Sequence, residues 1–300
     1  MKHKSGYVAI LGLPNAGKST LLNALLGQKL AITNKKPQTT RKNILGILSG
    51  NDYQIIFLDT PGILTPKYLL QKKMMEQVSS STGNADVLLL LIDVKEDPVG
   101  TKTFKQEYVN KLLGSEKQVV LILNKVDLIT QEISEKILKH FEEMNKFKAV
   151  IPLSATLNFN TQKLLNEIIE LLPEGPKFYP DDIVADESER FFVSEIIREK
   201  ILELYKEEIP YSCEVLISEF KERKGSKDYI SAEIVVERDS QKSIIIGKQG
   251  SAIKKLGQIA REAVEEFLQH SVFLELRVKV RKKWRSDEKW LKAFGYSKDK

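Results

Sequence analysis

The fold of this chain is decided near its start, by the stretch Gly12-Leu13-Pro14-Asn15-Ala16-Gly17-Lys18-Ser19. Residues 7–11, an apolar run of strand composition, precede it, and residues 20–26, of helix composition, follow it. A glycine-containing loop between a strand and a helix directs backbone N–H groups at a phosphate, where the helix dipole also favours negative charge. The pattern G-x-x-x-x-G-K-[ST] in this setting predicts a phosphate-binding loop.

The residue types in this loop suit a nucleotide bound with Mg²⁺. Lys18 would reach the β- and γ-phosphates, and the hydroxyl of Ser19 would ligate the metal. The loop backbone would surround the phosphates, so the predicted nucleotide-binding residues here are Gly12, Asn15, Ala16, Gly17, Lys18, Ser19 and Thr20. The alternative is a glycine turn that matches by accident.

A second motif fits a magnesium-dependent switch. Residues 44–48 and 54–58 are expected to form strands around a turn, and the second strand ends in Asp59-Thr60-Pro61-Gly62. An acid at a strand end can hold the magnesium shell, and a glycine three residues later can offer its N–H to the γ-phosphate. The polar residues up to 83 are expected to belong to the same switch.

The motif Asn124-Lys125-Val126-Asp127, directly after the apolar run 119–123, predicts which nucleobase is bound. The carboxylate of Asp127 can accept hydrogen bonds from N1–H and the exocyclic amino group of guanine, a donor pair that adenine lacks. Asn124 is expected to tie loops together and contact the ring, and the stem of Lys125 to cover a base face. Ser154-Ala155-Thr156 follows the run 149–153, and the N–H of Ala155 would contact guanine O6.

Apolar runs and helical patterns alternate through the first half of the chain. The run 87–92 reads as a strand buried on both faces. Thr130 is expected to cap a helix with Ile133, Ile137, Leu138 and Phe141 on one face. Such alternation predicts an α/β fold with a doubly wound, mostly parallel sheet and ligand loops at the carboxyl ends of the strands.

In this order the motifs resemble the translation-factor class of small GTPases. Within that class, Asn15 in the phosphate loop and the stretch Gln38-Thr39-Thr40-Arg41 resemble the branch of Era and MnmE. The resemblance implies GTP and GDP as ligands and Thr40 as a further Mg²⁺ ligand, so the expected metal ligands are Ser19, Thr40 and Asp59. It also implies that Lys18, Asn15, Thr40 and Gly62 carry catalysis.

The position after Gly62 departs from Ras-like GTPases. Ile63 stands where those enzymes carry a water-orienting Gln, and its side chain cannot hydrogen-bond water. In the related branch, K⁺ held partly by the loop Asn supplies positive charge, so the resemblance implies K⁺ beside Asn15. The alternative is that Asn15 only shapes the loop.

A proline-rich stretch, residues 172–182, separates the two halves of the chain. We therefore expect a GTPase domain over residues 1–172, a stiff linker over 173–186 and a second domain over 187–300. In the second domain a helix over 187–206 and strands over 213–217 and 230–236 precede a helix–turn–helix and a last strand.

The turn of that second domain contains Gly247-Lys248-Gln249-Gly250. G-x-x-G alone is common, but between two helices in an α-β-β-α-α-β order it resembles an α+β type II KH domain. Such domains bind single-stranded RNA, with the loop backbone near the phosphates. The expected RNA-binding residues here are Ile246, Gly247, Lys248, Gln249, Gly250 and Lys254. A dimerisation or protein-docking domain is the alternative.

The basic charge is concentrated at the end of the chain. The net charge is +6, and residues 271–300 carry an equal excess. A basic run with interleaved aromatic residues suits phosphate neutralisation and base stacking. The residues expected to bind RNA here are Arg281, Lys282, Lys283, Trp284 and Arg285. The alternative is a solvated helix that Trp290 and Phe294 pin to the domain.

Together these features resemble the Era family over essentially the whole chain. The resemblance implies binding to the 3′ end of 16S ribosomal RNA on the maturing 30S subunit, RNA-accelerated hydrolysis and peripheral membrane association. The single Cys213 and the lack of a signal-peptide core lead us to expect a cytoplasmic protein. We also expect it to be a monomer. The alternatives are an RNA-binding scaffold with a structural nucleotide, and a membrane or cell-cycle signalling switch.

Overall fold

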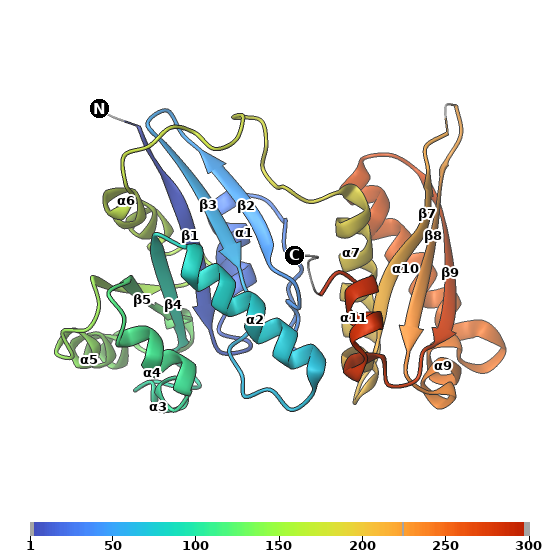
Figure 1. The fold of residues 1–300 in the computed structure, drawn as a ribbon, viewed down its shortest axis with the longest axis horizontal. Helices are drawn as coiled ribbons and strands as arrows, with labels where there is room; N and C mark the ends of the chain where they lie inside the picture. Colours follow the sequence, from blue (N-terminus) through green and yellow to red (C-terminus); the bar gives the residue numbers. More distant parts are fainter. Residues whose placement is uncertain (1–2, 224, 297–300) are drawn as a thin grey trace. The chain divides into compact units, whose positions relative to one another are not determined.

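The computed structural model describes residues 3–223 and 225–296. These residues fall into two compact units, each with its own sheet (Figure 1). The first unit comprises Met1–Lys67 and Met74–Asp186, and the second comprises Tyr68–Lys73 and Glu187–Lys300.

The first unit is built on a six-stranded sheet in the order β2-β3-β1-β4-β5-β6. All neighbouring pairs are parallel except β2 with β3, which form a hairpin. The strands are β1 (Lys4–Gly12), β2 (Ile44–Ser49), β3 (Tyr53–Asp59), β4 (Val87–Asp93), β5 (Gln118–Asn124) and β6 (Ala149–Leu153). Parallel neighbours bring the carboxyl ends of β1, β3, β4, β5 and β6 to one edge.

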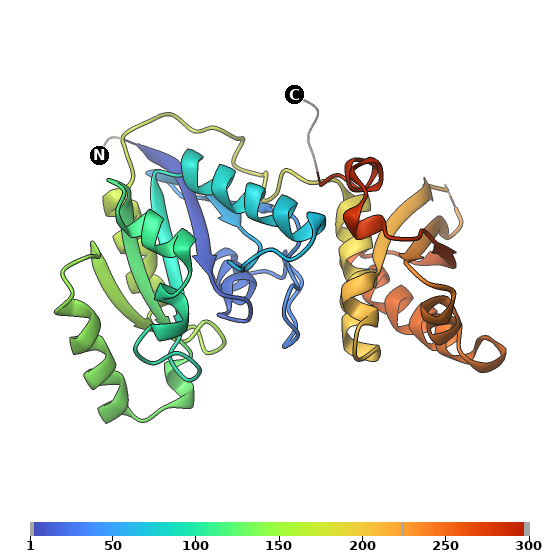
Figure 2. The ribbon, with the colours of Figure 1, turned by 60° about the horizontal axis from the view of Figure 1, so that its bottom comes forward.

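Helices lie on both faces of this sheet, which confirms the predicted doubly wound α/β fold (Figures 1 and 2). Side chains of α2, α4 and α5 share one apolar cluster with β1, β4 and β5. On the other face α1 contacts both the sheet and α6. The helices are α1 (Lys18–Leu26), α2 (Leu69–Asn84), α3 (Thr101–Phe104), α4 (Glu107–Leu113), α5 (Gln131–Glu142) and α6 (Thr161–Leu171).

Two of these helices differ from the sequence-based expectation. The polar segment up to residue 83 contains α2, whose Met74 and Val78 are fully buried at a helical spacing of four. Thr130 caps α5 as predicted, since its side chain accepts a hydrogen bond from the N–H of Ile133. On the predicted apolar face Ile137 and Phe141 are buried, whereas Ile133 in the first turn is 45% exposed.

The linker is held along the first unit rather than spanning open solvent. The side-chain amide of Gln54, fully buried in β3, accepts from the N–H groups of Phe178 and Tyr179 at 2.7 and 2.9 Å. Further along, the N–H of Ile47 in β2 donates to the carbonyl of Val184 at 2.8 Å. A buried amide satisfied by main-chain groups fixes the path of the linker on the β3–β2 hairpin.

The second unit has a three-stranded sheet in the order β7-β8-β9, with α7, α9 and α10 packed on it. The β7–β8 pair is antiparallel and the β8–β9 pair parallel. Its elements are α7 (Glu189–Leu204), α8 (Ile209–Ser212), β7 (Glu214–Lys221), β8 (Asp228–Val236), α9 (Asp239–Ile246), α10 (Ser251–Leu268), β9 (Val272–Val280) and α11 (Glu288–Ala293). This order confirms the expected α+β KH-type architecture.

Candidate nucleotide-binding site and RNA-binding loop

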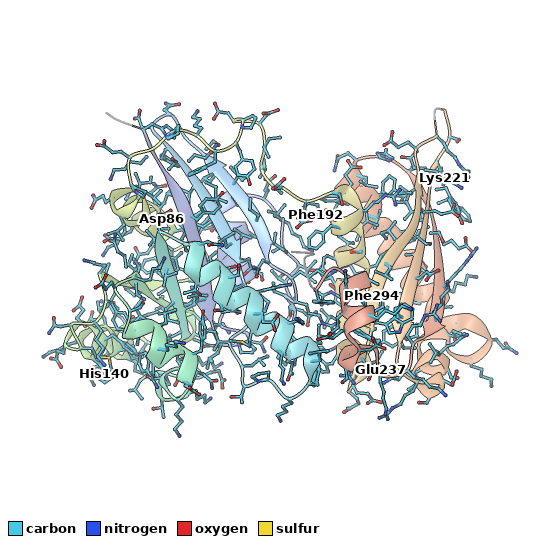
Figure 3. The ribbon with its side chains drawn as sticks, in the orientation of Figure 1. Asp86, His140, Phe192, Lys221, Glu237 and Phe294 are labelled. Carbon is cyan, nitrogen blue, oxygen red and sulfur yellow. The ribbon has the colours of Figure 1, made fainter. Side chains whose placement is uncertain are left out.

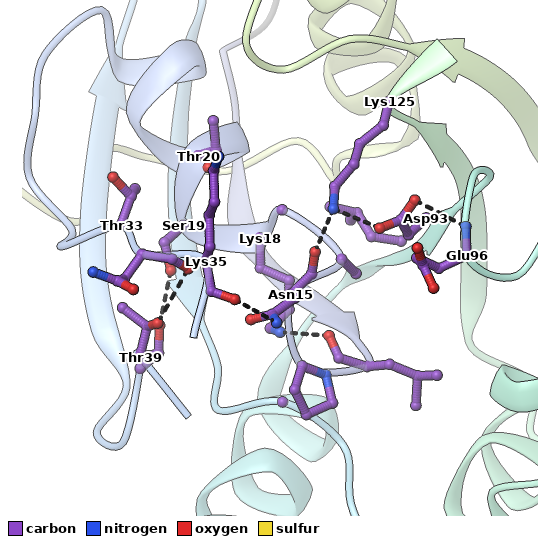
Figure 4. A pocket seen from close by; sticks show the side chains of 18 of the residues that line it. Asn15, Lys18, Ser19, Thr20, Thr33, Lys35, Thr39, Asp93, Glu96 and Lys125 are labelled. Atoms are coloured by element: carbon purple, nitrogen blue, oxygen red, sulfur yellow. Dashed lines mark hydrogen bonds and ion pairs between the residues drawn. The ribbon is translucent and has the colours of Figure 1, made fainter. Parts of the chain in front are cut away.

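The predicted nucleotide motifs meet at the carboxyl edge of the first sheet. They surround a cavity of about 870 Å³ whose wall includes the loop Leu13–Thr20, Thr40, Gly62 and Lys125 (Figure 4). A second cavity of about 470 Å³ lies between Asp127 and Ser154. The structure therefore brings together residues from four separate strand ends.

The phosphate loop approaches β5 so closely that a side chain would not fit. Gly17 has φ +99°, and a Cβ there would lie 2.2 Å from Nδ2 of Asn124. Only glycine adopts this conformation without strain and leaves the amide in place. The amide donates to the carbonyl of Ala16 at 2.8 Å, and its Oδ1 accepts from the N–H of Ala155 at 3.1 Å.

Asn124 therefore ties the phosphate loop to the loop after β6, as its sequence position suggested. This contact also affects the expected recognition of guanine O6. The N–H of Ala155 already donates to Oδ1 of Asn124, so O6 would have to share or displace that acceptor. Asp127 lines the second cavity together with Leu157 and Phe159, which offers a carboxylate beside apolar walls suited to a base.

Lys18 is buried at the centre of the phosphate loop. Its ammonium donates to the carbonyls of Leu13 and Gly12 at 3.2 and 3.4 Å. Burial lowers the pKa of Lys18 to about 8, although the nearby Asp59 carboxylate partly offsets this effect. A phosphate would supply the strong anionic partner that two backbone carbonyls do not.

The three predicted magnesium ligands form one hydrogen-bonded cluster. The hydroxyl of Ser19 lies 2.6 Å from Oδ2 of Asp59 and 2.8 Å from the hydroxyl of Thr40. Thr40 also donates to Oδ2 of Asp59 at 3.2 Å. Burial raises the pKa of the Asp59 carboxyl, whose Oδ1 is buried without a hydrogen-bond partner.

Three clustered oxygens with one buried orphan atom fit a hard divalent cation. In this cluster Asp59 would contribute or orient the anionic oxygen, and Ser19 and Thr40 the neutral ones. When bound, Mg²⁺ would neutralise charge on the β- and γ-phosphate oxygens. The same contacts join the phosphate loop to the segment that precedes β2.

Ile63 does not face the cavity. Its side chain is 1% exposed and belongs to the apolar cluster under α2 and α4, while its N–H donates to the carbonyl of Gly12 at 3.0 Å. The residue after Gly62 therefore anchors the switch to the core.

The side chain of Asn15 contacts residues 27–42, the segment containing Thr40 that we expect to act as the first switch. The residue has φ 66°, and its Nδ2 donates to the carbonyl of Lys35 at 2.8 Å. Its own carbonyl accepts from the ammonium of Lys125, which also contacts Asp93 (Figure 4). Sequence reasoning missed Asp93, although an acid directly after the apolar run 87–92 was a usable signal.

In the second unit, the backbone of the G-x-x-G loop adopts a conformation that requires glycine at Gly247. Gly247 has φ 72°, and a Cβ there would lie 2.6 Å from Cβ of Ala252 at the start of α10. Lys248 and Gln249 are exposed, and Ile244 beside the loop exposes 51% of its surface. Lys254 is also exposed on the first turns of α10. An apolar side chain next to exposed backbone and lysines suits stacked bases and phosphates.

The basic run after β9 is divided between core and surface. Trp284 is fully buried, donates its indole N–H to the carbonyl of Ser212 at 3.0 Å and packs on Phe294, labelled in Figure 3. Because its ring has no exposed face for a base, we withdraw Trp284 from the candidate RNA-binding residues. The burial of Phe294 favours the alternative, in which this residue pins the last helix to the domain.

The cations of this run differ in their contacts. Arg285 forms an ion pair with Glu237, its Nε lying 3.0 Å from Oε2 (Glu237 is labelled in Figure 3). Arg281 lies over the ring of Trp290 at 4.8 Å. Lys282 and Lys283 are exposed and remain the cations best placed to meet a polyanion.

Two family models match the chain. The model of 50S ribosome-binding GTPases matches residues 7–125, and the KH-domain model matches residues 208–285. GTPase Era of Geotalea daltonii is 46% identical over 97% of this chain and 97% of its own. GTPase Era of Caldanaerobacter subterraneus subsp. tengcongensis is 44% identical over 100% of both chains.

Solved structures agree over nearly the whole length. A variant of Aquifex aeolicus Era bound to GDP and aluminium fluoride has a TM-score of 0.93 and 38% identity, covering 98% of this chain and 100% of that one. An Era complex with MgGDPNP and nucleotides 1506–1542 of 16S ribosomal RNA has a TM-score of 0.93 and 39% identity, covering 99% and 100%. The chain is a member of the Era family of GTPases.

Proposed function

We propose that this protein is a GTP-hydrolysing switch that binds the 3′ end of 16S ribosomal RNA through its KH domain. In this role it acts in assembly of the 30S subunit and maturation of its RNA. The proposal rests on the family, on the RNA complex of the related Era structure and on the site described above.

The observation that carries the switch is the cluster of Ser19, Thr40 and Asp59. These residues come from the phosphate loop, the segment before β2 and the end of β3, and they lie within 3.2 Å of one another. A cation and a γ-phosphate at this point would hold both switch segments, and hydrolysis would release them. The nucleotide would thus control the conformation of residues 27–42 and 63–83, and within the second segment α2 is already formed and packed through Met74 and Val78.

Hydrolysis would depend on charge rather than on a water-orienting side chain, because Ile63 is buried in the core. We further propose that K⁺ binds beside Asn15. The Asn15 amide nitrogen is engaged by Lys35, while its Oδ1 has no hydrogen-bond partner among the described residues. An amide oxygen near backbone carbonyls suits a monovalent cation, which would supply positive charge to the transition state.

RNA would meet the second unit at the Gly247–Gly250 loop and at Lys282 and Lys283. A direct test compares Lys248→Glu with Lys139→Glu, an equal charge change at an exposed position of α5. We expect Lys248→Glu to weaken binding of a 16S 3′-end oligonucleotide at least tenfold at fixed salt, because it repels phosphates at the loop. Equal affinities of the two variants would contradict RNA binding at this loop.

Lys18→Ala separates the switch from a scaffold with a structural nucleotide. The switch requires that this variant lose GTP hydrolysis and fail to support subunit assembly, since Lys18 is the cation placed for the phosphates. Full assembly activity with Lys18→Ala would favour the scaffold. Over residues 3–223 and 225–296, no helix combines the length and apolarity needed to cross a bilayer.

A further inference from the structure

We propose that Asp93 is a positioning residue that holds the ammonium of Lys125 against the phosphate loop and thereby slows release of the nucleotide. The inference rests on the guanine-nucleotide site proposed above. It assigns a role to a residue outside the sequence motifs that define that site.

The ammonium of Lys125 joins three segments of the site. It lies 2.5 Å from Oδ2 of Asp93 and 2.8 Å from the carbonyl oxygen of Asn15 (Figure 4). Asp93 ends β4, Asn15 lies in the phosphate loop, and Lys125 belongs to the base-recognition motif after β5. One cation thus links the loops for base and phosphate.

Asp93 is itself held in place. It pairs with Asn124 across the β4–β5 ladder, so the strand register sets it beside the base-recognition motif. Its Oδ1 accepts from the N–H groups of Lys95 and Glu96 at 3.1 and 3.3 Å. With its side chain only 12% exposed, the carboxylate is oriented before Lys125 arrives.

The Asp93 carboxylate matters because the other partner of the Lys125 ammonium, the Asn15 carbonyl, holds it only weakly. A lysine ammonium on a flexible stem is strongly hydrated, and a single backbone carbonyl does not hold it as a carboxylate does. Without Asp93 the ammonium would turn toward solvent, and the Asn15 carbonyl would lose its partner. Asn15 also donates to the Lys35 carbonyl, so the loosened loop would include a contact with the first switch.

The test is the dissociation rate of fluorescent GDP, chased with excess GDP in stopped flow with Mg²⁺ present. We expect Asp93→Asn, which is nearly isosteric, to release GDP about tenfold faster, because it replaces a charge-assisted hydrogen bond by a neutral one. Glu116→Gln removes the same charge at an exposed position that lines neither cavity, and should stay within about twofold of wild type.

A double-mutant cycle with Lys125→Met distinguishes positioning from general loosening. Methionine keeps the apolar stem but lacks the ammonium, so Lys125→Met should itself accelerate release, and adding Asp93→Asn should change the rate by less than about twofold. The same acceleration by Asp93→Asn in both backgrounds would overturn the proposal. So would release at the wild-type rate from Lys125→Met, a result that does not depend on folding of the Asp93 variant.

The wild-type measurement separates this inference from the proposed function. Failure of wild-type protein to bind GDP would refute the nucleotide site and the role of Asp93 with it. Normal GDP binding with unchanged release from Asp93→Asn would refute the role of Asp93 alone.

Discussion

Replacing Asn124 with alanine tests whether one buried amide joins the loops of the site. The side chain is 2% exposed, donates to Ala16 and accepts from Ala155. Alanine removes both interactions at once and leaves a carbonyl and an N–H where water has little access. The loss of stability should therefore exceed the loss caused by removing an ordinary surface hydrogen bond.

The expected magnitude follows from counting these two groups. Leaving a buried donor or acceptor without a partner costs about 1–3 kcal/mol, so the two groups together cost about 2–6 kcal/mol. That is a large share of the roughly 5–15 kcal/mol that stabilises a typical folded domain. GDP affinity should fall as well, because both separated loops line the nucleotide cavities.

The loss of unfolding free energy can be measured by amide hydrogen exchange of the peptide covering β4 (Val87–Asp93), because this strand lies in the core of the first unit. Asn160→Gly is the matched control. Asn160 donates one hydrogen bond, to the carbonyl of Pro152 at 2.8 Å, and its φ of 59° suits glycine. The reasoning would be refuted if Asn124→Ala lowered the unfolding free energy by less than about 1 kcal/mol, or if Asn160→Gly lowered it equally.

Three further predictions concern charge, base and packing. Lys18 has a pKa of about 8, which a bound phosphate would raise, so binding of GDP above pH 8 requires uptake of a proton. The affinity for GDP should therefore fall about tenfold from pH 7 to pH 9. Binding of guanosine, which has no phosphate, should stay constant. Asp127→Asn should shift preference to xanthosine nucleotides in competition binding, and retained GTP selectivity would contradict the base assignment. Trp284→Ala should destabilise the second unit by about 3–5 kcal/mol in hydrogen exchange. Lys282→Ala should instead leave stability within about 0.5 kcal/mol and lower the salt dependence of RNA binding by about one charge. Unchanged stability with weakened RNA binding in Trp284→Ala would restore Trp284 as an RNA contact.

The parts of the site that sequence predicts well are those encoded locally. The loop Gly12–Ser19 and the motif Asn124–Asp127 each combine an apolar strand with a fixed short pattern, so their positions follow from strand composition and spacing. The convergence of Ser19 and Asp59 follows in turn, since parallel strands bring their carboxyl ends to one edge.

The parts that sequence does not predict depend on tertiary neighbours. Asp93 meets Lys125 only because β4 lies next to β5 in a particular register. Trp284 lies among cations, and a short basic turn has no periodicity that shows which side chain points inward. Gln54 resembles any polar strand residue until the linker supplies the main-chain groups that satisfy it.

The central claim is that this chain is a GTPase whose turnover responds to RNA. Its most direct test is GTP turnover by the full chain with and without an oligonucleotide of the 16S 3′ end, each in K⁺ and in Na⁺. We expect slow hydrolysis that the RNA accelerates, and faster turnover in K⁺ than in Na⁺. Turnover that neither RNA nor K⁺ changes would contradict the account.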